Sequence, residues 1–501
     1  MPVPKNGMKL TALVVVLAVL SMALVGCGGA ATPAPTPTTV AAAPTAATEA
    51  TVAPSEPAAE VGAASLLGAY AGAIDIVGQK LAIDVRIQEG EDGLSGELDI
   101  PAQGAFGIPL DKLTFEGSTV SFTILSGPSL GVFAGEVDAD GNVAGSFVQA
   151  GYTGTFTLQP AVAEELPYRE EEVTFSHGDI TLAGTLSLPD GEGPFPAVVM
   201  ISGTGAQSRD ENVMGFRVFF EMSDYLTRHG IAVLRYDDRG VGGSTGDLTV
   251  ATQDDLAEDV SAAVDLLLTR DDIDPDAIGL IGHSEGGLVA PITANLNQGV
   301  SYLVLVSGPA TTGEQVLMDQ LELIMAAQGA SAEEIEAAKV TQQQTLAAVK
   351  TGEGWEEIIA RSEAELRAIV EALPEEQRKT IGDVDKFVED NIAAQIAGVN
   401  NPWFRSFVEY DPVPALQALK VPVLGLFGSL DLQVPAEKNA AAMGEALKQA
   451  GVSHRVEIIP EANHLFQKAI TGAVEEYGVL EPAFAPGMLD LIRDWILEQV
   501  G

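Results

Sequence analysis

Cysteine and histidine are scarce in this sequence. Cys27 is the single cysteine among 501 residues, so no disulfide can form within one chain and no metal site can be built on cysteine ligands. The five histidines stand at positions 177, 229, 283, 454 and 464 and show no H-E-x-x-H or similar ligand spacing. We therefore expect neither a metal ion nor another cofactor.

Basic residues are also few. The chain carries 26 Lys and Arg against 71 Asp and Glu, a formal net charge of −45. Nucleic acids and anionic lipid headgroups bind through basic side chains, so neither is an expected electrostatic partner. We interpret the acidity as a property that keeps an exported protein soluble. The hydrophobic fraction of 46% is ample for a large core, and the length leaves room for two domains or one with insertions.

The N-terminal segment has the features of an export signal. Lys5 and Lys9 precede an apolar run over residues 10–25, which is shorter than the roughly twenty residues that cross a bilayer. Leu24-Val-Gly-Cys27 resembles the lipobox of bacterial lipoproteins, which implies cleavage before Cys27 and lipidation of that cysteine. We expect residues 1–26 to be a signal peptide and the protein to be exported and lipid-anchored on the extracytoplasmic face of the bacterial membrane. Ordinary secretion with an incidental cysteine is the alternative.

Two regions of different composition follow. Residues 27–61 consist mainly of Ala, Pro and Thr, which predicts a disordered tether behind the lipidated cysteine. Residues 62–160 show alternating hydrophobicity, as at 81–87, with turn signals at 92–93, 116–117 and 140–141. This pattern predicts a small all-β domain, an antiparallel barrel or sandwich. A structural spacer is its expected role, and an acyl-chain or surface-binding module is the alternative.

The strongest catalytic signal lies in residues 277–290. The apolar run 277–281 predicts a buried parallel strand, Gly282-His-Ser284-Glu-Gly286 matches G-x-S-x-G, and a helix begins after it. Such a turn lifts a serine hydroxyl out of the chain, where a base and backbone donors can reach it. Ser284 is therefore the predicted nucleophile. His283 is expected to pack or to line the pocket rather than to act as the base.

Two later strands supply partners for this serine. Asp431 follows the predicted strand 422–427, and His464 follows the predicted strand 454–459. The order Ser284, Asp431, His464 is that of α/β hydrolases. We expect His464 to act as general base and Asp431 to orient it.

A glycine-rich loop provides the expected oxyanion donors. Gly203-Thr-Gly205 follows the predicted strand 196–202, at the position where an α/β hydrolase holds its second donor. We predict that the backbone N–H groups of Thr204 and Glu285 bind the oxyanion. The next strand ends in Asp237-Asp238-Arg239, where we expect one aspartate to pair with Arg239 and fix the loop.

A long segment separates the late strands. Residues from about 310 to 400 are rich in Glu, Ala, Gln and Leu, with helix breaks near 329, 352 and 374. They predict several amphipathic helices that form a lid over the serine and select the substrate. A solvated appendage or a dimer surface is the alternative. Trp403 and Phe404 follow as possible pocket residues, with core packing equally expected.

Taken together, these segments resemble the α/β-hydrolase superfamily, and more narrowly bacterial serine carboxylesterases with an extra N-terminal β domain. The matching segments cover the chain from about residue 170 to 501, and they are 202–205, 209–212, 235–240, 282–287, 402–405, 428–431 and 463–464. Residues 99–109 and 145–149 similarly resemble the β domain of some bacterial hydrolases.

The resemblance implies a catalytic domain over 170–501 with the α/β-hydrolase fold, a mostly parallel sheet flanked by helices with a helical lid insertion. It also implies hydrolysis of small-molecule carboxylic esters, of short to medium acyl chain, through an acyl-enzyme on Ser284. A serine peptidase, acyl-peptidase or thioesterase of the same superfamily is one alternative. A non-catalytic surface-binding lipoprotein is the other.

Overall fold

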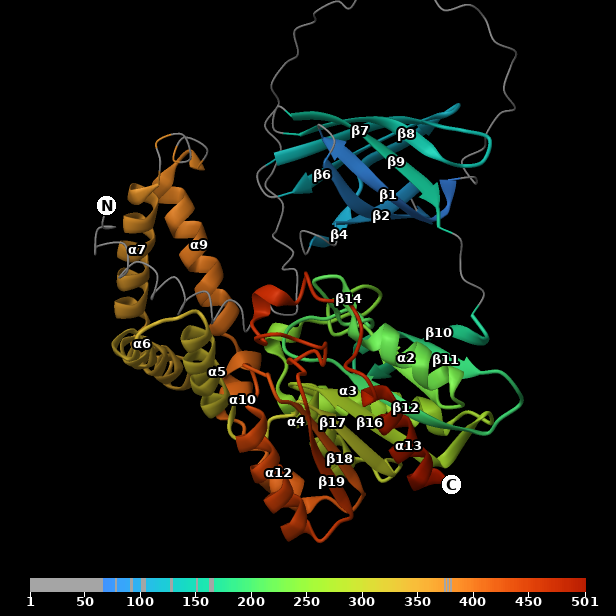
Figure 1. Cartoon of the computed structure of the whole chain (residues 1–501), viewed down its shortest axis with the longest axis vertical. Helices are drawn as coiled ribbons and strands as arrows, with labels where there is room; N and C mark the ends of the chain where they lie inside the picture. The colour runs from blue at the N-terminus through green and yellow to red at the C-terminus, as the bar shows by residue number, and fades with distance from the viewer. Residues whose placement is uncertain are drawn as a thin grey trace, which may run out of the picture. The chain divides into compact units, whose positions relative to one another are not determined.

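The computed structural model describes residues 66–76, 79–90, 93–100, 105–126, 129–149, 152–161, 166–373, 375, 378 and 381–501. The expected signal peptide, lipidation site and tether lie outside the described residues. The described chain divides into two compact units, an all-β unit within residues 66–161 and an α/β unit from residue 166 to 501 (Figure 1). None of the described helices is both long and apolar enough to cross a bilayer.

The all-β unit is one antiparallel sheet, which confirms the expected all-β architecture. Its strand order is β4-β3-β2-β1-β9-β8-β7-β6-β5. Chain neighbours pair except β4 and β5, which end the order, and β1 also pairs with β9. The sheet curls until it is nearly closed, with β3 approaching β5. The strands are β1 (Gly68–Ile76), β2 (Gln79–Gly90), β3 (Gly93–Ile100), β4 (Ala105–Pro109), β5 (Asp111–Glu116), β6 (Thr119–Ser126), β7 (Ser129–Val137), β8 (Val143–Gln149) and β9 (Tyr152–Pro160).

Alternation of side chains builds the interior of this unit. Inward residues of β6, β7 and β9 bring Phe122, Phe133 and Phe156 together, with the Phe122 and Phe133 rings stacked at 4.6 Å and Phe133 edge-on to Phe156 at 5.1 Å. These rings are buried in the core of the sheet. Aromatic pairs in such geometries add stability beyond the burial of their area, and the interior of the unit is filled by side chains.

The α/β unit is organised by an eight-stranded sheet of order β10-β11-β15-β12-β16-β17-β18-β19. The pairs β10–β11 and β11–β15 are antiparallel, and all later pairs are parallel. The strands are β10 (Tyr168–His177), β11 (Ile180–Pro189), β12 (Phe195–Ile201), β15 (Ala232–Tyr236), β16 (Ile273–His283), β17 (Tyr302–Val306), β18 (Val423–Gly428) and β19 (His454–Ile459). A two-stranded ribbon, β13 (Asn212–Val213) and β14 (Phe216–Arg217), lies outside the sheet.

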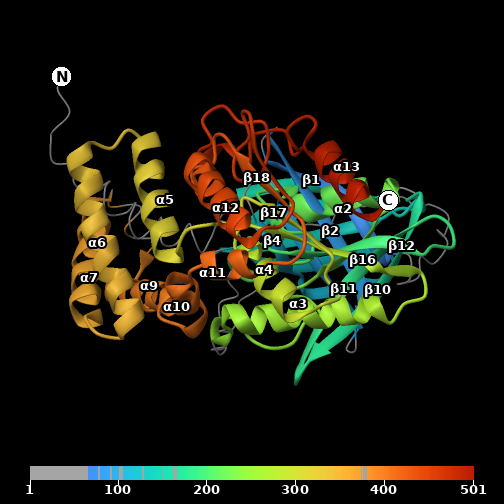
Figure 2. The ribbon, with the colours of Figure 1, turned by 90° about the horizontal axis from the view of Figure 1, so that it is seen from below.

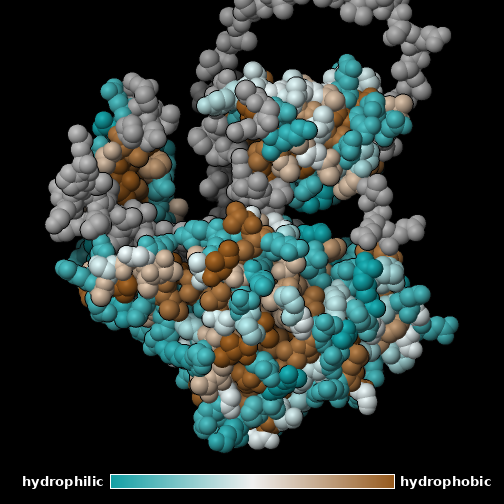
Figure 3. Space-filling model, in the orientation of Figure 1, coloured by the Kyte–Doolittle hydropathy of each residue, from teal (hydrophilic) through white to brown (hydrophobic). Residues whose placement is uncertain are grey.

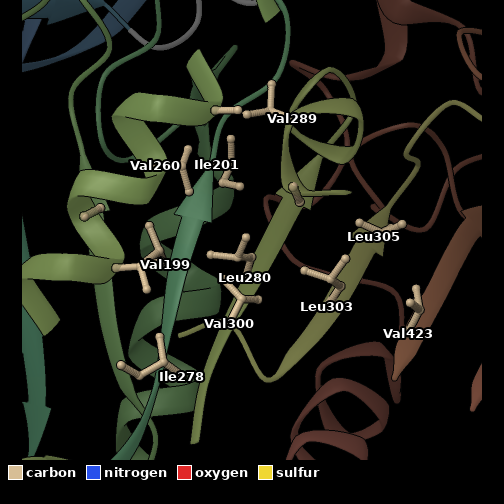
Figure 4. Close-up of a cluster of buried hydrophobic side chains, with 14 of the residues drawn as sticks. Val199, Ile201, Val260, Ile278, Leu280, Val289, Val300, Leu303, Leu305 and Val423 are labelled. Atoms are coloured by element: carbon tan, nitrogen blue, oxygen red, sulfur yellow. The ribbon is translucent and has the colours of Figure 1, made fainter. Parts of the chain in front are cut away.

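Helices cover both faces of this sheet. Alternate residues of the central strands point to opposite faces, so Leu280 and Leu303 enter one core while Ile281 and Val304 enter the other. Figure 4 shows the first core, in which Val260 and Val289 of two covering helices reach the sheet. That face carries α3 (Gln253–Leu268), α4 (Gly286–Leu296), α11 (Val413–Ala418) and α12 (Ala436–Ala450), and the opposite face carries α2 (Val218–Arg228) and α13 (Met488–Val500).

The insertion lies between β17 and β18 and is helical. It consists of α5 (Gly313–Ala327), α6 (Ala332–Thr351), α7 (Trp355–Ala372), α9 (Val384–Val399) and α10 (Pro402–Glu409), grouped together in Figures 1 and 2. Ser331 and Glu334 begin α6 with a capping box, and Gly352 ends it in the left-handed conformation. Leu321, Leu346 and Phe404 belong to a third hydrophobic cluster, which also includes Leu288 of α4. On the face shown in Figure 3, hydrophilic and hydrophobic residues are interspersed, with hydrophobic residues gathered in patches.

Candidate active site

The turn between β16 and α4 holds Ser284 in a strained conformation. Ser284 has φ of 52°, in the left-handed region that a residue with a side chain occupies at a cost of about 1–3 kcal/mol. Its backbone N–H donates to the carbonyl oxygen of Val306 at 2.9 Å, which ties the turn to the end of β17. The strand–turn–helix context expected from the sequence is present, and the serine sits at the carboxyl edge of the parallel strands.

Two glycines around this serine are required by close packing. A Cβ atom on Gly286 would lie 2.1 Å from the carbonyl oxygen of Ile201, and one on Gly282 would lie 2.2 Å from the carbonyl oxygen of Gly286. No side chain fits at such distances. The glycines of the G-x-S-x-G pattern therefore let α4 approach β12 and β16 closely enough to fix the turn.

Asp431 and His464 form a buried pair. Asp431 Oδ2 lies 2.8 Å from His464 Nδ1 and also accepts the hydroxyl of Ser307 at 2.7 Å. Its Oδ1 accepts the backbone N–H groups of Gln433 and Val434, both at 2.8 Å. Burial by itself raises the pKa of Asp431, but the charge of His464 and these hydrogen bonds outweigh it and hold the pKa below its ordinary value. The structure thus keeps Asp431 ionised beside the imidazole.

Ser284, His464 and Thr204 line one pocket. The empty space between its lining atoms is about 520 Å³, part of it open to solvent. Helices α5 and α10 of the insertion supply much of the wall. The other lining residues are Pro309, Val316, Leu317, Gln320, Phe404, Phe407, Gln433 and Val434.

The polar part of the pocket wall is neutral. Gln320 on α5 donates through its side-chain amide to Gln433 at 3.3 Å, and Gln433 donates to the hydroxyl of Tyr477 at 3.0 Å. Among the described lining residues none is Asp, Glu, Lys or Arg. The pocket therefore suits an uncharged, largely apolar group that can form a few hydrogen bonds.

Two backbone N–H groups are available beside Ser284. In the described part of the chain, no protein acceptor is found for the N–H of Thr204 or of Glu285. The loop of residues 203–205, called the oxyanion loop below because it holds an expected oxyanion donor, packs against Ser284: a Cβ atom on Gly203 would lie 3.2 Å from Ser284 Cβ. An oxyanion hole needs N–H groups that no protein acceptor already occupies.

The side chain of Glu285 connects the elbow to the insertion. Its Oε1 accepts from Gln253 Nε2 at 2.5 Å and from the indole N–H of Trp403 at 2.9 Å. Burial raises the pKa of Glu285, and hydrogen bonds from Gln253, Trp403 and Thr204 oppose that rise. Of the two candidates on α10, Phe404 lines the pocket, whereas Trp403 is buried behind it and bonds to Glu285.

His283 does not line the pocket. Its Nδ1 lies 2.8 Å from Glu211 Oε1, and its Nε2 lies 3.1 Å from the backbone carbonyl oxygen of His464. The His283 and His464 rings are 4.9 Å apart between centroids. Sequence reasoning missed Glu211, although it lies in the stretch 209–212 that carried part of the family resemblance.

The expected pairing of Arg239 with a neighbouring aspartate is wrong. Arg239 instead bonds to Asp259 on α3, at 2.6 Å from its Nε. Asp237 pairs with Arg209 at 2.7 Å, and Asp238 accepts the hydroxyl of Ser202 at 2.9 Å. Arg239 does not pair with Asp237 or Asp238, because the loop turns each of these side chains toward a different element. Across the described residues, no three His, Cys, Asp or Glu side chains are grouped so as to hold a metal ion.

Comparisons with known proteins place the chain among hydrolases. Residues 214–468 match the model of the Hydrolase_4 family, described as serine aminopeptidase, S33. Esterase EstD from Thermotoga maritima is 27% identical over 332 residues, covering 66% of this chain and 67% of the relative. A 2,6-dihydropseudooxynicotine hydrolase from Paenarthrobacter nicotinovorans is 33% identical over 100 residues, covering 20% of this chain and 24% of that protein. The solved structure of a DcsB complex with its substrate analogue has a TM-score of 0.40 at 18% identity, covering 66% of this chain and 99% of that one.

Proposed function

The chain belongs to the Hydrolase_4 family of α/β hydrolases, described as serine aminopeptidase, S33, and we propose that this hydrolase cleaves carboxylic esters of short to medium acyl chain through an acyl-enzyme on Ser284. One observation carries the proposal: Ser284 and His464 line the same pocket, which among its described lining residues has no Asp, Glu, Lys or Arg, and Asp431 is bonded to His464. A relative at 27% identity is named an esterase, which supports the same substrate class.

In the proposed reaction, the hydroxyl of Ser284 attacks the ester carbonyl while His464 accepts its proton. Asp431 keeps the ring of His464 oriented and stabilises its cation. The N–H groups of Thr204 and Glu285 donate to the oxyanion of the tetrahedral intermediate. His464 then protonates the departing alcohol, and water activated by the same histidine releases the acid from Ser284.

Aminopeptidase activity is the second candidate, because the family description names it. An aminopeptidase has to recognise a charged α-amino group, for which a carboxylate in the pocket is the natural partner. Among the described lining residues there is no carboxylate. Glu285 belongs to the elbow, but its Oε1 already accepts hydrogen bonds from Gln253 and Trp403. We therefore favour uncharged esters over amino-terminal peptides.

We propose that the insertion acts as the lid and selects the acyl group. Val316 and Leu317 of α5 and Phe404 and Phe407 of α10 form pocket wall, so the depth of the site depends on where these two helices lie. The hydrogen bond from Trp403 to Glu285 links α10 to the nucleophile elbow.

We also propose export and lipid anchoring through Cys27, with the all-β unit as a spacer between anchor and hydrolase. The lipobox-like residues 24–27 and the apolar run before them support this location. Metabolic labelling with an alkyne fatty acid should mark the full chain in the membrane fraction. The Cys27→Ser variant should lose the label, and a variant that keeps it would refute the anchor.

The substrate class is tested by two matched sets of reagents. The purified full chain is assayed with p-nitrophenyl esters of increasing acyl length and with aminoacyl p-nitroanilides. We expect ester hydrolysis that falls off beyond medium acyl chains and is lowered about 10⁴-fold or more in Ser284→Ala. Preferential cleavage of the anilides would favour the aminopeptidase, and equal activity of the variant would refute Ser284 as nucleophile.

A further inference from the structure

His283 is surrounded by acceptors at both ring nitrogens. Nδ1 faces the carboxylate oxygen Oε1 of Glu211 at 2.8 Å, and Nε2 faces the backbone carbonyl oxygen of His464 at 3.1 Å. The exposed fractions of His283 and Glu211 are 1% and 0%, so bulk water does not replace either partner. Each of these two contacts is a hydrogen bond only if a proton lies between the ring nitrogen and the oxygen.

Counting protons fixes the state of the pair. A carbonyl oxygen cannot donate, so Nε2 must carry a hydrogen. The contact between Nδ1 and Glu211 needs a second hydrogen, and imidazole is a stronger base than a carboxylate, which places that hydrogen on Nδ1. His283 is then an imidazolium and Glu211 its counter-ion. Within the described residues Glu211 Oε2 has no hydrogen-bond partner, so the imidazolium is the cation that compensates this buried carboxylate.

The same carboxylate oxygen reaches the oxyanion loop. Glu211 Oε1 accepts the backbone N–H of Gly203 at 2.8 Å, one residue before Thr204. A Cβ atom on Gly203 would lie 3.0 Å from Glu211 Oε1 and 3.5 Å from His283 Nδ1, so the three groups are in direct contact. The pair therefore contacts three segments. Glu211 bonds to the oxyanion loop, and His283 directly precedes Ser284 in the chain. Nε2 of His283 bonds to the backbone carbonyl of His464, in the His464 loop.

We propose that the His283 imidazolium and the Glu211 carboxylate form a buried brace that positions the nucleophile turn, the oxyanion loop and the His464 loop relative to one another. This inference rests on the proposed function, because it assigns those three segments their catalytic roles. His283 and Glu211 are positioning residues, since neither lines the pocket.

The charged groups around His283 favour this state. Burial by itself lowers the pKa of His283, but the charge and hydrogen bond of Glu211, the bond to His464 and the charge of Asp431 outweigh it and raise the pKa above 6.5. His464 approaches from the loop after β19, and Asp431 from the loop after β18. Asp238, after β15, is a further acidic group near Glu211, and Glu285, in the elbow, lies near Asp238.

Loss of the proton would break the brace. A neutral His283 can donate from only one nitrogen, so it loses either Glu211 or the carbonyl of His464. Replacing Glu211 by Gln does not restore both contacts, because the atom at the Oε1 position must accept from Gly203 and from His283 at once. A glutamine oxygen there has no negative charge to hold the imidazolium, and a glutamine nitrogen there opposes the N–H of Gly203.

The proton count is measured directly by NMR. The full chain has five histidines, so selective ¹⁵N labelling of histidine rings gives few enough signals to follow from pH 5 to 10. We expect the His283 ring to keep both nitrogens protonated above pH 7 and its signals to be absent in His283→Gln. His177→Gln identifies the signals of His177, whose ring also faces a carboxylate at each nitrogen. If His283→Gln does not fold, the His→Gln variants at 177, 229, 454 and 464 assign the signal by elimination. A His283 ring with an unprotonated nitrogen at pH 7 would overturn the proposal, whether or not the protein hydrolyses esters.

The functional consequence is measured as kcat/KM against pH. We expect this profile to show an alkaline limb from His283. Glu211→Gln should move the alkaline limb at least about one pH unit lower, with recovery of activity toward acid pH. His454→Gln, which removes an exposed histidine, should leave the profile unchanged, and Ser284→Ala serves as the blank. A Glu211→Gln profile that is lowered evenly at every pH would overturn the positioning role.

Discussion

The α/β unit contains two buried histidine–carboxylate pairs that look alike and differ in one contact. In both pairs a carboxylate oxygen lies 2.8 Å from Nδ1 of the ring, and in both the side chains are almost inaccessible to water. In the described chain, however, Nε2 of His464 has no protein acceptor and the ring lines the pocket, whereas Nε2 of His283 is held by a carbonyl oxygen. The free Nε2 of His464 can accept and release a proton at the pocket. The His283 ring is hydrogen-bonded at both nitrogens, so it can only hold its protons.

The carboxylates differ in a corresponding way. Asp431 accepts hydrogen bonds at both oxygens, from His464, Ser307, Gln433 and Val434. Glu211 accepts at one oxygen, and its other oxygen has no partner in the described structure. Asp431 therefore has three donors besides His464 that stabilise its charge, whereas in the described structure Glu211 has only the N–H of Gly203 besides His283 and depends more on the imidazolium. The comparison predicts that the first pair acts in the chemistry and the second in its geometry.

The largest expected effect is on the first pair. His464→Ala should lower kcat for p-nitrophenyl esters by about 10⁵–10⁶-fold, because the serine loses its base. His454→Ala removes an exposed histidine of the same unit and should stay near wild type. A decrease in kcat of less than 100-fold in His464→Ala would show that another residue is the base. The two histidine–carboxylate pairs would then not differ in the way described above.

The next effect falls on the orienting acid. Asp431→Asn keeps the shape of the side chain but presents an amide in place of a carboxylate, and we expect kcat to fall about 10⁴-fold. Ser307→Ala, which removes one of the bonds to Asp431, is the matched mild variant and should cost at most about 10-fold. Equal losses in these two variants would show that Asp431 acts through hydrogen bonding alone.

The second pair should matter more for stability. Glu211→Ala leaves a buried imidazolium without its counter-ion, and we expect the free energy of unfolding to fall by about 3–5 kcal/mol. Urea unfolding followed by tryptophan fluorescence reports on the α/β unit, because Trp355, Trp403 and Trp495 all belong to it. A loss below about 1 kcal/mol would mean that Glu211 carries no buried charge.

A pocket variant should leave both pairs intact. Phe407→Ala enlarges the wall that α10 contributes, and we expect the preferred acyl chain to lengthen, with the ratio of long-chain to short-chain kcat/KM rising about 10–100-fold. Leu497→Ala, at a partly exposed position on α13, is the control. An unchanged chain-length profile would show that α10 does not select the acyl group.

The smallest effect is a difference in how the two pairs respond to pH. The pKa of Asp431 is lower in the folded protein than its ordinary 3.8, so its contribution to stability is present above that pH and is lost as the pH falls toward the folded value. The pKa of His283 is raised above 6.5, so its contribution is fully present below pH 6.5 and is lost as the pH rises through the folded value.

Unfolding midpoints between pH 3 and 10 test these opposite signs. Relative to wild type, Asp431→Asn should flatten the acid side of the stability profile and His283→Gln the alkaline side, each by about 1 kcal/mol or more. Two variants that flatten the same side would contradict the assignment of charge to the pairs.

The sequence predicted the site residues whose positions follow from the direction of the parallel strands. Ser284, Asp431 and His464 each follow an apolar run, and the carboxyl ends of parallel strands meet at one edge of a sheet, so their convergence follows from the pattern. The antiparallel all-β unit was similarly predicted by alternation of side chains and by turn signals. Both predictions use periodicities that the backbone imposes.

The contacts made through loops could not be predicted in this way. Glu211 lies in a loop between β12 and α2, and no periodicity indicates that its side chain turns inward to His283. The partner of Arg239 was mistaken because sequence proximity favoured Asp237 and Asp238, whereas the folded loop presents Arg239 to Asp259 on α3. Trp403 likewise bonds to Glu285, 118 positions away in the chain. Such pairings depend on tertiary structure that a single sequence does not encode locally.

The central claim is that Ser284 becomes acylated with His464 as its base, and it is tested most directly by trapping the intermediate. The full chain is mixed with a p-nitrophenyl ester, quenched with acid within one turnover, and digested for mass spectrometry. We predict the acyl mass on the peptide that contains Ser284, and no such mass in Ser284→Ala or His464→Ala. An acyl group on another residue, or ester hydrolysis with no covalent adduct on Ser284, would contradict the account.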